Sequence, residues 1–355
     1  MHGVKRSRIP PVADSAEVER KRREKQLEAI AHYTDLVDQL QARMAANDHS
    51  QESLDLTTKI LGMNPEYHTG WSQRRTILLQ GPLNEADAEA RQRVLEHDLD
   101  LTNSSLRLNP KNYSVWEHRK WVLETMPDAD WALEIKIVEM FLEKDGPTVH
   151  SWDYRRYLIE SIQSIRNRQE DSVRTKPLPN PTTESELNFT TRKISSNFSN
   201  FSAWHYRTKL LAKLWHEKGW DEDHQDRRNR IDQEFDLVKQ AIWSDPNDQS
   251  AWLYHRWLVG TGSIALVRRE IAGIEELLEE EPDSRWCLDS LVHYKRLLVQ
   301  LLSAEKGQDG EAGPRAEQER LRLECKEMLD RLIQVDPMRA NRYRDISLQI
   351  IPARR

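Results

Sequence analysis

The sequence predicts an all-α protein, a superhelical solenoid of about six to seven helical hairpins, and three observations support this. Tryptophan is unusually frequent, with 12 in 355 residues against 5 phenylalanines. Six tryptophans recur at intervals of 34 to 52 residues, and a period of roughly 20–50 residues is typical of stacked supersecondary units. No segment combines the alternating apolar pattern of a strand with hairpin turn signals. The repeat positions are Trp71, Trp116, Trp152, Trp204, Trp252 and Trp286, with Tyr343 in the same position of a seventh copy.

Composition excludes several classes of protein. The chain has 53 Lys and Arg against 59 Asp and Glu, and this balance argues against a nucleic-acid-binding protein. No apolar run approaches the ~20 residues that a membrane span needs. Cys287 and Cys325 are far apart and form no CxxC motif, which excludes a disulfide framework and a cysteine zinc site within this chain. The cysteine usage is typical of a reducing compartment, and we expect a cytoplasmic protein.

Residues 1–50 are expected to form an N-terminal segment and a first helix, and residues 51–350 to form the repeat array. In each of the first five copies an Asn or Asp stands seven residues before the tryptophan. An apolar periodic stretch such as residues 99–108 precedes it, and a proline follows it in most copies, so the first helix of each hairpin should end there. The prolines are Pro65, Pro110, Pro246, Pro282 and Pro337.

The second helix of each hairpin should begin four residues before its tryptophan. Asn112, Thr148, Asn200 and Asp248 occupy that position, and all four are residue types that favour the helix N-cap. Tyr67 occupies it in the first copy and departs from the rule. Polar stretches between the copies predict loops over residues 166–190, 217–230 and 303–318, and the low complexity of the last predicts disorder.

The residues that repeat around each tryptophan are interpreted as structural. A buried indole packs neighbouring hairpins and needs one acceptor for its N–H group. An arginine three residues later shares the same helix face, so it can stack beside the ring or bond carbonyl groups of the next hairpin. Histidines near the tryptophans are interpreted as hydrogen-bonded junction residues. The arginines are Arg74, Arg119, Arg155 and Arg207, and the histidines are His118, His150, His205 and His255.

The repeat text, Asn/Asp–Pro–x–Asn–Tyr–x–x–Trp–x–x–Arg, resembles the repeat of protein prenyltransferase α subunits over residues 57–347. Three segments resemble the Rab geranylgeranyltransferase (type II) branch of that family: residues 197–207, 245–259 and 281–288. The opening MHGVKR and the end after the seventh copy resemble its short, fungal-like form. This resemblance implies a crescent of hairpins around a β subunit, which would carry the catalytic zinc. It also implies a Rab escort protein as a partner.

The reaction implied by the resemblance is transfer of a geranylgeranyl group from geranylgeranyl diphosphate to C-terminal cysteines of Rab GTPases. The α subunits of this family contribute a lysine that contacts the diphosphate, and its motif is matched by Pro110-Lys111-Asn112-Tyr113. Composition alone would make Lys111 a solvated turn residue. Tyr113 matches a neighbouring tyrosine of the family. In the third copy His150 keeps one member of an aromatic–His pair, while Val149 replaces the other.

Two other functions stay open at this point. The chain could be the α subunit shared by farnesyltransferase and type I geranylgeranyltransferase, although these subunits carry a long Pro-rich N-terminal tail. A tetratricopeptide-like adaptor without enzymatic activity is the other alternative, and its motif at strict 34-residue spacing does not occur. His2 could bring an N-terminal imidazole to the partner's zinc.

Overall fold

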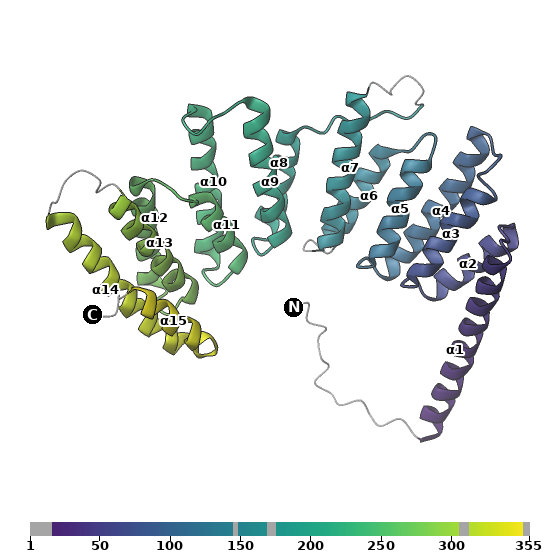
Figure 1. Ribbon diagram of the computed structural model, residues 1–355, viewed down its shortest axis with the longest axis horizontal. Coiled ribbons are helices and arrows are strands. Elements are labelled where there is room, and N and C mark those ends of the chain that lie inside the picture. The colour runs from purple at the N-terminus through teal and green to yellow at the C-terminus, as the bar shows by residue number, and fades with distance from the viewer. Residues whose placement is uncertain (1–15, 145–147, 169–174, 305–311, 351–355) are drawn as a thin grey trace. The chain divides into compact units, whose positions relative to one another are not determined.

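The computed structural model describes residues 16–144, 148–168, 175–304 and 312–350, and all regular elements in this part of the chain are helices (Figure 1). The chain divides into two compact units, residues 1–142 with 148–180 and residues 143–147 with 181–355. The first contains α1 (Ala16–Ala45), α2 (Gln51–Met63), α3 (His68–Gln80), α4 (Ala88–Leu108), α5 (Tyr113–Thr125), most of α6 (Trp131–Lys144), and α7 (Val149–Asn167). The second contains α8 (Thr183–Ser196), α9 (Phe201–Lys218), α10 (Gln225–Ser244), α11 (Gln249–Val259), α12 (Ile264–Glu280), α13 (Arg285–Ala304), α14 (Ala312–Val335), the 3₁₀ helix η3 (Pro337–Arg339) and α15 (Ala340–Ile350).

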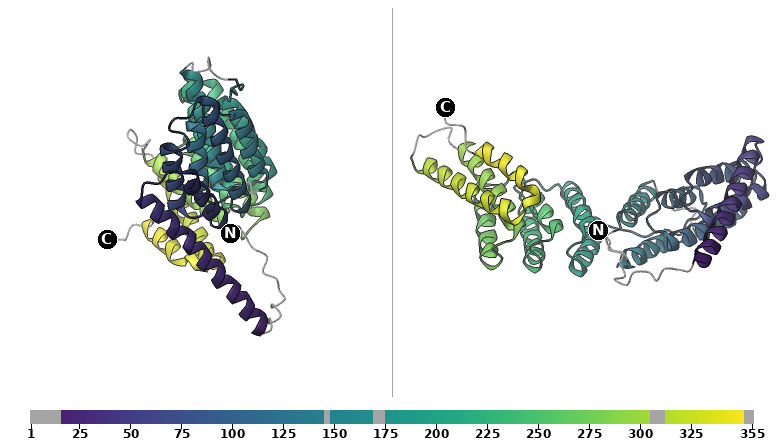
Figure 2. Two further views of the ribbon diagram at one scale, coloured as in Figure 1. Left: turned by 90° about the vertical axis from the view of Figure 1, so that its right-hand side faces the viewer. Right: turned by 90° about the horizontal axis from the view of Figure 1, so that it is seen from below.

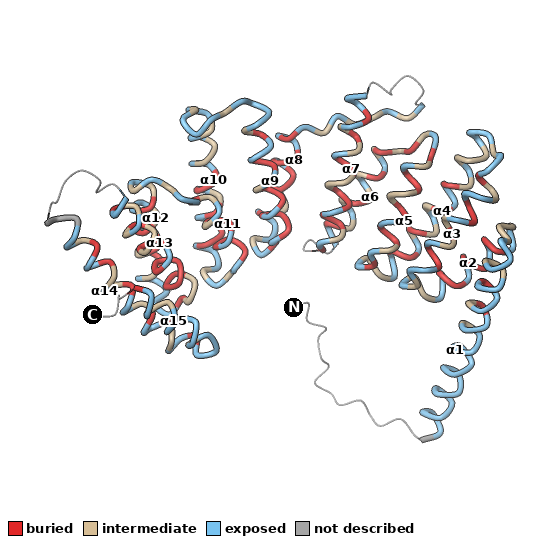
Figure 3. The backbone as a smooth tube through the Cα atoms, in the orientation of Figure 1, coloured by how far each residue is buried: buried red, intermediate tan, exposed pale blue. Residues whose placement is uncertain are grey.

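The helices pair into antiparallel hairpins, as the sequence predicts. Within each unit α2 packs on α3, α4 on α5, α8 on α9, α10 on α11, and α12 on α13. The second helices of successive hairpins also contact one another, α3 with α5 and α5 with α7 in the first unit (Figures 1 and 2). Buried residues lie on the helix sides that face these neighbours, whereas residues 17–32 of α1 are exposed (Figure 3).

The repeat tryptophans form the buried centre of the hairpins, which confirms their structural interpretation. Trp71 and Trp204 are each 1% exposed. Each donates its indole N–H to the backbone carbonyl six residues earlier, at 2.9 Å to Pro65 and 2.8 Å to Phe198. This bond ties the second helix to the end of the first. Trp116 and Trp252 make the same bond to Pro110 and Pro246.

The sixth copy differs from the prediction. Trp286 is partly exposed, and the fully buried residue at this place is Leu288. Leu288 stands seven residues after Glu281, the same offset as in the other copies, and Ser284 takes the cap position four residues before it. The chain therefore keeps the spacing of the repeat and changes the residue type. In the seventh copy Tyr343 is 1% exposed and donates its hydroxyl to Asp336.

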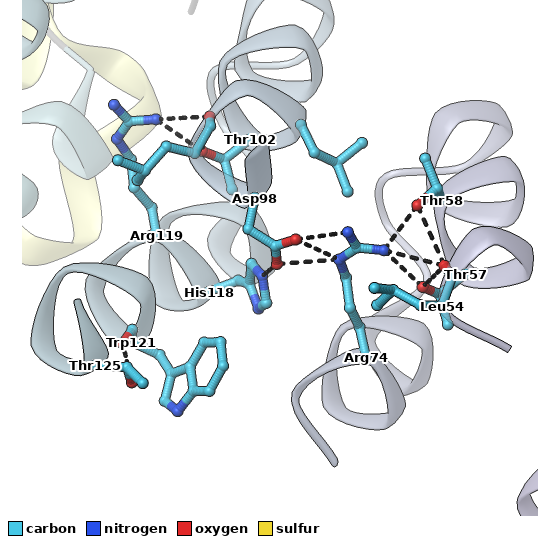
Figure 4. Close-up of polar contacts among 12 residues, drawn as sticks. Leu54, Thr57, Thr58, Arg74, Asp98, Thr102, His118, Arg119, Trp121 and Thr125 are labelled. Carbon is cyan, nitrogen blue, oxygen red and sulfur yellow. Dashed lines mark hydrogen bonds and ion pairs between the residues drawn. The ribbon is translucent and has the colours of Figure 1, made fainter. Parts of the chain in front are cut away.

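The arginines three residues after the tryptophans are structural, but their carbonyl partner differs from the prediction. Arg74 Nη1 donates to the backbone carbonyl of Leu54 and the hydroxyls of Thr57 and Thr58 (Figure 4). These groups belong to the first helix of the same hairpin, not to the next hairpin. Arg119 and Arg207 repeat the pattern, each reaching a carbonyl 20 residues earlier and a threonine hydroxyl 17 residues earlier.

The contact of these arginines with the next hairpin is made through a buried carboxylate. Asp98 on α4 accepts from Arg74 of the first hairpin at 2.6 Å and lies 2.8 Å from the imidazole of His118 on α5 (Figure 4). Burial alone would raise the pKa of Asp98, but the hydrogen bond from His118 and the charge of Arg74 hold it below the usual range. Glu134 joins Arg119 to Tyr154 in the same way, and Glu234 joins Arg207 to Tyr254.

The links between hairpins are shorter than the predicted loops. Helix α8 begins at Thr183 behind a capping box made by Thr182 and Ser185, so residues 183–190 are helical. Helix α9 extends to Lys218 and α10 begins at Gln225, which leaves six residues between them. Residues 312–318, predicted to be disordered, belong to α14. Residues 175–182 and 219–224 are not helical, as predicted, but the predicted loops extend too far because polar, charged helix starts resemble loop sequence. Residues 169–174 and 305–311 lie outside the described part of the chain.

Candidate functional site

The four-residue link between α4 and α5 carries Lys111. Asn109 ends α4, and its side-chain oxygen accepts from the backbone N–H of Lys111 at 3.1 Å. Asn112 is the N-cap of α5, and its side-chain oxygen accepts from the backbone N–H of Ser114 at 3.0 Å. These local bonds fix the backbone of the link on both sides of Lys111, as the asparagine-rich sequence favours.

The link is also tied to the preceding hairpin. The side-chain amide of Asn112 donates to the carbonyl of Pro65 at 2.7 Å, and the amide of Asn109 donates to Glu66 at 2.7 Å. Asn112 is 5% exposed, so its bonds are shielded from water. Lys111 itself is exposed, and among the described residues it has no carboxylate within 4 Å. The fold thus holds the backbone of the link through four hydrogen bonds, and no carboxylate of the described chain pairs with the ammonium group.

The structure brings the three sequence-predicted site residues together. Tyr113 is the first residue of α5 and is 62% exposed. Its ring meets the imidazole of His150, the second residue of α7, edge to face, with the ring centroids 4.0 Å apart. Lys111 is close enough to lower the pKa of His150 through its charge. Residues of two successive hairpins therefore form one small cluster.

The surroundings of His150 favour the neutral form of its imidazole. Burial is the main cause that lowers its pKa, and the Lys111 charge lowers it further, while Asp153 acts in the opposite direction. Nδ1 of His150 is buried and has no hydrogen-bond partner among the residues that the structure describes. A neutral imidazole, a phenol and a free ammonium offer hydrogen-bond donors and one positive charge. Such a group suits an anionic ligand that arrives from solvent.

A second polar cluster lies farther along α5 and α7, and the sequence reasoning missed it. Lys120 bonds Glu117 at 2.8 Å and Asp153 at 3.3 Å, and its ammonium lies 5.3 Å from the ring centroid of Tyr157. Burial would lower the pKa of Lys120, but its bonds to Glu117 and Asp153 raise it. The sequence contained a signal for this cluster, because Lys120 directly follows the repeat arginine Arg119 and Asp153 directly follows the repeat tryptophan Trp152.

The remaining predicted residues have mixed outcomes. His118 and His255 are buried junction residues, as expected, and His255 bonds Glu270 at 2.9 Å. His205 differs, because it is exposed and stacks on Phe201. Val149 is 58% exposed and provides no aromatic ring beside His150. His2 lies outside the described residues.

No group of three or more His, Cys, Asp or Glu side chains in the described part of the chain could hold a metal ion. The two cysteines are free and buried on different helices, and burial raises the pKa of both thiols, that of Cys325 to about 11. The described residues therefore do not fit a catalytic zinc. None of the described helices combines the length and the apolar character needed to cross a membrane.

Comparison with known proteins identifies the repeat. A family model described as "Protein prenyltransferase alpha subunit repeat" matches residues 50–81, 95–126, 183–214 and 231–261. These segments cover all or most of the hairpins α2–α3, α4–α5, α8–α9 and α10–α11. The chain is 37% identical to the geranylgeranyl transferase type-2 subunit alpha of Schizosaccharomyces pombe, across 99% of this chain and 98% of that protein. The chain belongs to the family of geranylgeranyl transferase type-2 alpha subunits.

Other members of this family agree with the assignment. The subunit of Candida albicans is 27% identical over 97% of this chain and 96% of its own length. The rat subunit is 36% identical over 73% of this chain, and the match covers 42% of the rat protein. A solved structure of Candida albicans protein geranylgeranyltransferase-I complexed with GGPP superimposes with a TM-score of 0.63 at 22% identity, covering 90% of this chain and 91% of that one. That likeness concerns the fold.

Proposed function

We propose that this chain is the α subunit of a heterodimeric Rab geranylgeranyltransferase. The observation that carries the proposal is the 37% identity to a geranylgeranyl transferase type-2 subunit alpha across nearly the whole of both chains. The shared α subunit of farnesyltransferase and type I geranylgeranyltransferase is disfavoured, because the curated relatives reported above are all type-2 subunits. The adaptor alternative is disfavoured by the same family assignment.

The proposed reaction joins two substrates. The thiolate of a C-terminal Rab cysteine attacks C1 of geranylgeranyl diphosphate, a thioether forms, and the C1–O bond breaks to release diphosphate. A β subunit would complete the enzyme, and we assign the zinc to that subunit because the described residues of this chain offer no ligand set. A Rab escort protein would present the Rab substrate. The free cysteines support a cytoplasmic location.

We propose that Lys111 contacts the diphosphate. Charge grows on the leaving oxygen as the C1–O bond breaks, and a preorganised cation at that oxygen lowers the barrier. Lys111 meets these requirements because its backbone is fixed and its ammonium has no carboxylate partner among the described residues. Tyr113 can donate its hydroxyl to the same anion. His150 packs against the tyrosine ring at 4.0 Å and would keep that ring in position.

The test of the function is reconstitution. Co-expression of this chain with candidate β subunits should give a heterodimer that prenylates a Rab GTPase with geranylgeranyl diphosphate, and escort protein should increase the rate. The chain alone should be inactive. Transfer to a peptide ending in a farnesyltransferase recognition sequence, without transfer to a Rab, would contradict the proposal and favour the alternative α subunit.

Substitution of Lys111 tests its chemical role. Lys111→Ala should lower the single-turnover prenylation rate by about 10–1000-fold, equivalent to ~1.4–4 kcal/mol of barrier. Lys111→Arg should recover part of the rate. Heterodimer formation and affinity for the prenyl diphosphate should change much less, because the exposed side chain buries little surface.

The matched control is Lys136→Ala, which removes an exposed lysine on α6. Single-turnover rates of this variant should equal the wild-type rate. If Lys111→Ala also retains the wild-type rate, Lys111 is a surface residue without a role in the reaction.

A further inference from the structure

The backbone carbonyl of Pro65, in the link between α2 and α3, accepts two hydrogen bonds. Nε1 of Trp71 donates to it from the same hairpin at 2.9 Å. The side-chain amide of Asn112 donates to it from the next hairpin at 2.7 Å. A carbonyl oxygen has two lone pairs, so both bonds can form together. The first bond fixes the carbonyl within its own hairpin, and the second attaches the α4–α5 link to that fixed group.

Asn112 uses different atoms to cap α5 and to reach the first hairpin. Its Oδ1 accepts from the backbone N–H of Ser114 at 3.0 Å, and its Nδ2 donates to the Pro65 carbonyl. Aspartate and glycine are also favourable N-cap residues, but neither has a side-chain N–H group to donate. The amide N–H of Asn112 therefore serves the contact with the first hairpin and not the cap.

Two other links show that a hairpin folds without an amide at this position. Asp248 takes it in the α10–α11 link, and Ser284 takes it in the α12–α13 link. Asp248 cannot donate, and it accepts instead from the exposed hydroxyl of Ser199. The hydroxyl of Ser284 donates to the Pro246 carbonyl at 3.4 Å, a longer bond than that of Asn112. Of these three links, the α4–α5 link is held most closely to a backbone group of the preceding hairpin.

The link with the short amide bond is also the link that carries a cation. Lys111 stands one residue before the cap, where the other two links have Asn247 and Asp283. On the other side of Lys111, the amide of Asn109 donates to Glu66 of the first hairpin at 2.7 Å. The lysine therefore stands between two residues whose side-chain amides reach the first hairpin.

A cation stabilises a developing charge only when it is held at the right place, and a displacement of about 1 Å can lower a rate by roughly 100-fold. The bonds within the link fix its shape, but its place in the unit depends on bonds to other hairpins. We propose that Asn112 is a positioning residue for Lys111. Its bond to the Pro65 carbonyl holds the ammonium group where it meets the diphosphate, so this inference rests on the proposed contact of Lys111.

A double-mutant cycle tests the proposal in the reconstituted heterodimer. Asn112→Gly removes the amide without adding charge, and glycine is a tolerated N-cap. This change should lower the single-turnover rate constant by about 5–50-fold, while the stoichiometry and affinity of geranylgeranyl diphosphate binding change less than about twofold. In the Lys111→Ala background the same change should lower the rate constant less than about twofold, because no ammonium group is left to position.

Two further variants separate positioning from loss of a cap and from charge. Asn200→Gly removes the side-chain cap of α9 in the second unit and should leave the rate constant unchanged. Asn112→Asp keeps the cap with the residue type found at Asp248, and it provides the same cycle if Asn112→Gly does not assemble. A slow Asn112→Asp variant beside an Asn112→Gly variant with the wild-type rate would assign the effect to charge and overturn the proposal.

The cycle distinguishes this inference from the function on which it rests. Equal losses from Asn112→Gly in both backgrounds would overturn the inference, because Asn112 would then not act through Lys111. If Lys111→Ala is slow and Asn112→Gly has the wild-type rate, the inference alone fails. If Lys111→Ala has the wild-type rate, the proposed diphosphate contact fails and the inference fails with it.

Discussion

At the scale of the residue, the buried arginines stabilise the junctions between successive hairpins. Arg207 makes two bonds to Glu234, at 2.6 and 2.7 Å, and both side chains are at most 5% exposed. Removal of one partner from such a pair leaves a charge in the interior, which costs more than the pair contributes. A single substitution in the repeated Arg–carboxylate contact should therefore lower the stability strongly, whereas replacement of both residues by an apolar pair could be tolerated.

Arg207→Leu should lower the free energy of unfolding by about 3–5 kcal/mol, because Glu234 then lacks its main counter-ion. The second change Glu234→Gln in the same variant should recover part of this loss. The comparison is Arg93→Leu, which breaks the exposed Arg93–Glu89 pair and should cost less than ~1 kcal/mol. Chemical denaturation measures all three, and similar losses for Arg207→Leu and Arg93→Leu would contradict the argument.

Trp204→Ala should cost roughly 3–5 kcal/mol, because it removes a large side chain that is 1% exposed together with its bond to the Phe198 carbonyl. Trp243 offers a comparison in the same unit, since it is 42% exposed. Trp243→Ala should cost less than half as much. Melting of Trp204→Ala within a degree or two of the wild type would show that this position is not a packed junction.

At the scale of the element, the α4–α5 hairpin contains a buried histidine whose protonation opposes folding. Burial lowers the pKa of His118 below 6.5, against the effect of its bond to Asp98. The unfolded chain therefore binds a proton in the pH range just below 6.5 that the folded chain does not bind. Stability from this residue is present above pH 6.5 and is lost as the pH falls through the folded pKa.

His118→Gln should retain a donor toward Asp98 and remove this titration. The variant should lose less stability than the wild type between pH 7 and pH 5, as measured by denaturant unfolding at each pH. His216→Gln changes an exposed histidine on α9 and should leave the wild-type pH dependence intact. Parallel curves for the wild type and His118→Gln would remove His118 as the source of the effect.

The sequence predicted elements well where spacing decides the structure. The offset of seven residues located the end of the first helix and the offset of four the start of the second, and both offsets hold even where Leu288 replaces tryptophan. The carboxylates Asp98, Glu134 and Glu234 were not predicted, because their distances from the arginines along the chain differ from copy to copy. The threonines did provide a signal, since one stands 17 residues before each of Arg74, Arg119 and Arg207.

The candidate site was predicted through resemblance more than through spacing. Lys111 by itself is typical of a solvated turn. The link indicated a diphosphate contact only when the whole motif, residues 110–113, was compared with the family. The contact of Tyr113 with His150 joins residues of two hairpins. Such a contact depends on how neighbouring hairpins pack, which local sequence patterns do not reveal. The cluster around Lys120 also joins two hairpins, but its residues directly follow the repeat Arg and Trp positions and could have been noticed.

At the scale of the whole molecule, damage should remain within one compact unit. Contacts in a repeat array are made between neighbours, so each unit keeps its own core. Trp252→Ala should accelerate hydrogen exchange in α10 and α11 by roughly 100-fold, equivalent to a loss of ~3 kcal/mol. Exchange in α2–α5 should stay at the wild-type rate. Uniform acceleration along the chain would indicate a single cooperative unit.

The bond from Arg74, Arg119 and Arg207 to a carbonyl 20 residues earlier has a consequence for related sequences. An insertion inside a hairpin would move the arginine away from that carbonyl and from the threonine 17 residues earlier. An insertion between hairpins changes only the interval to the next carboxylate, which already varies among 24, 15 and 27 residues. Length differences among orthologues should therefore accumulate in the connections that follow each arginine helix, and a fluorescent tag or epitope inserted there should leave the array intact.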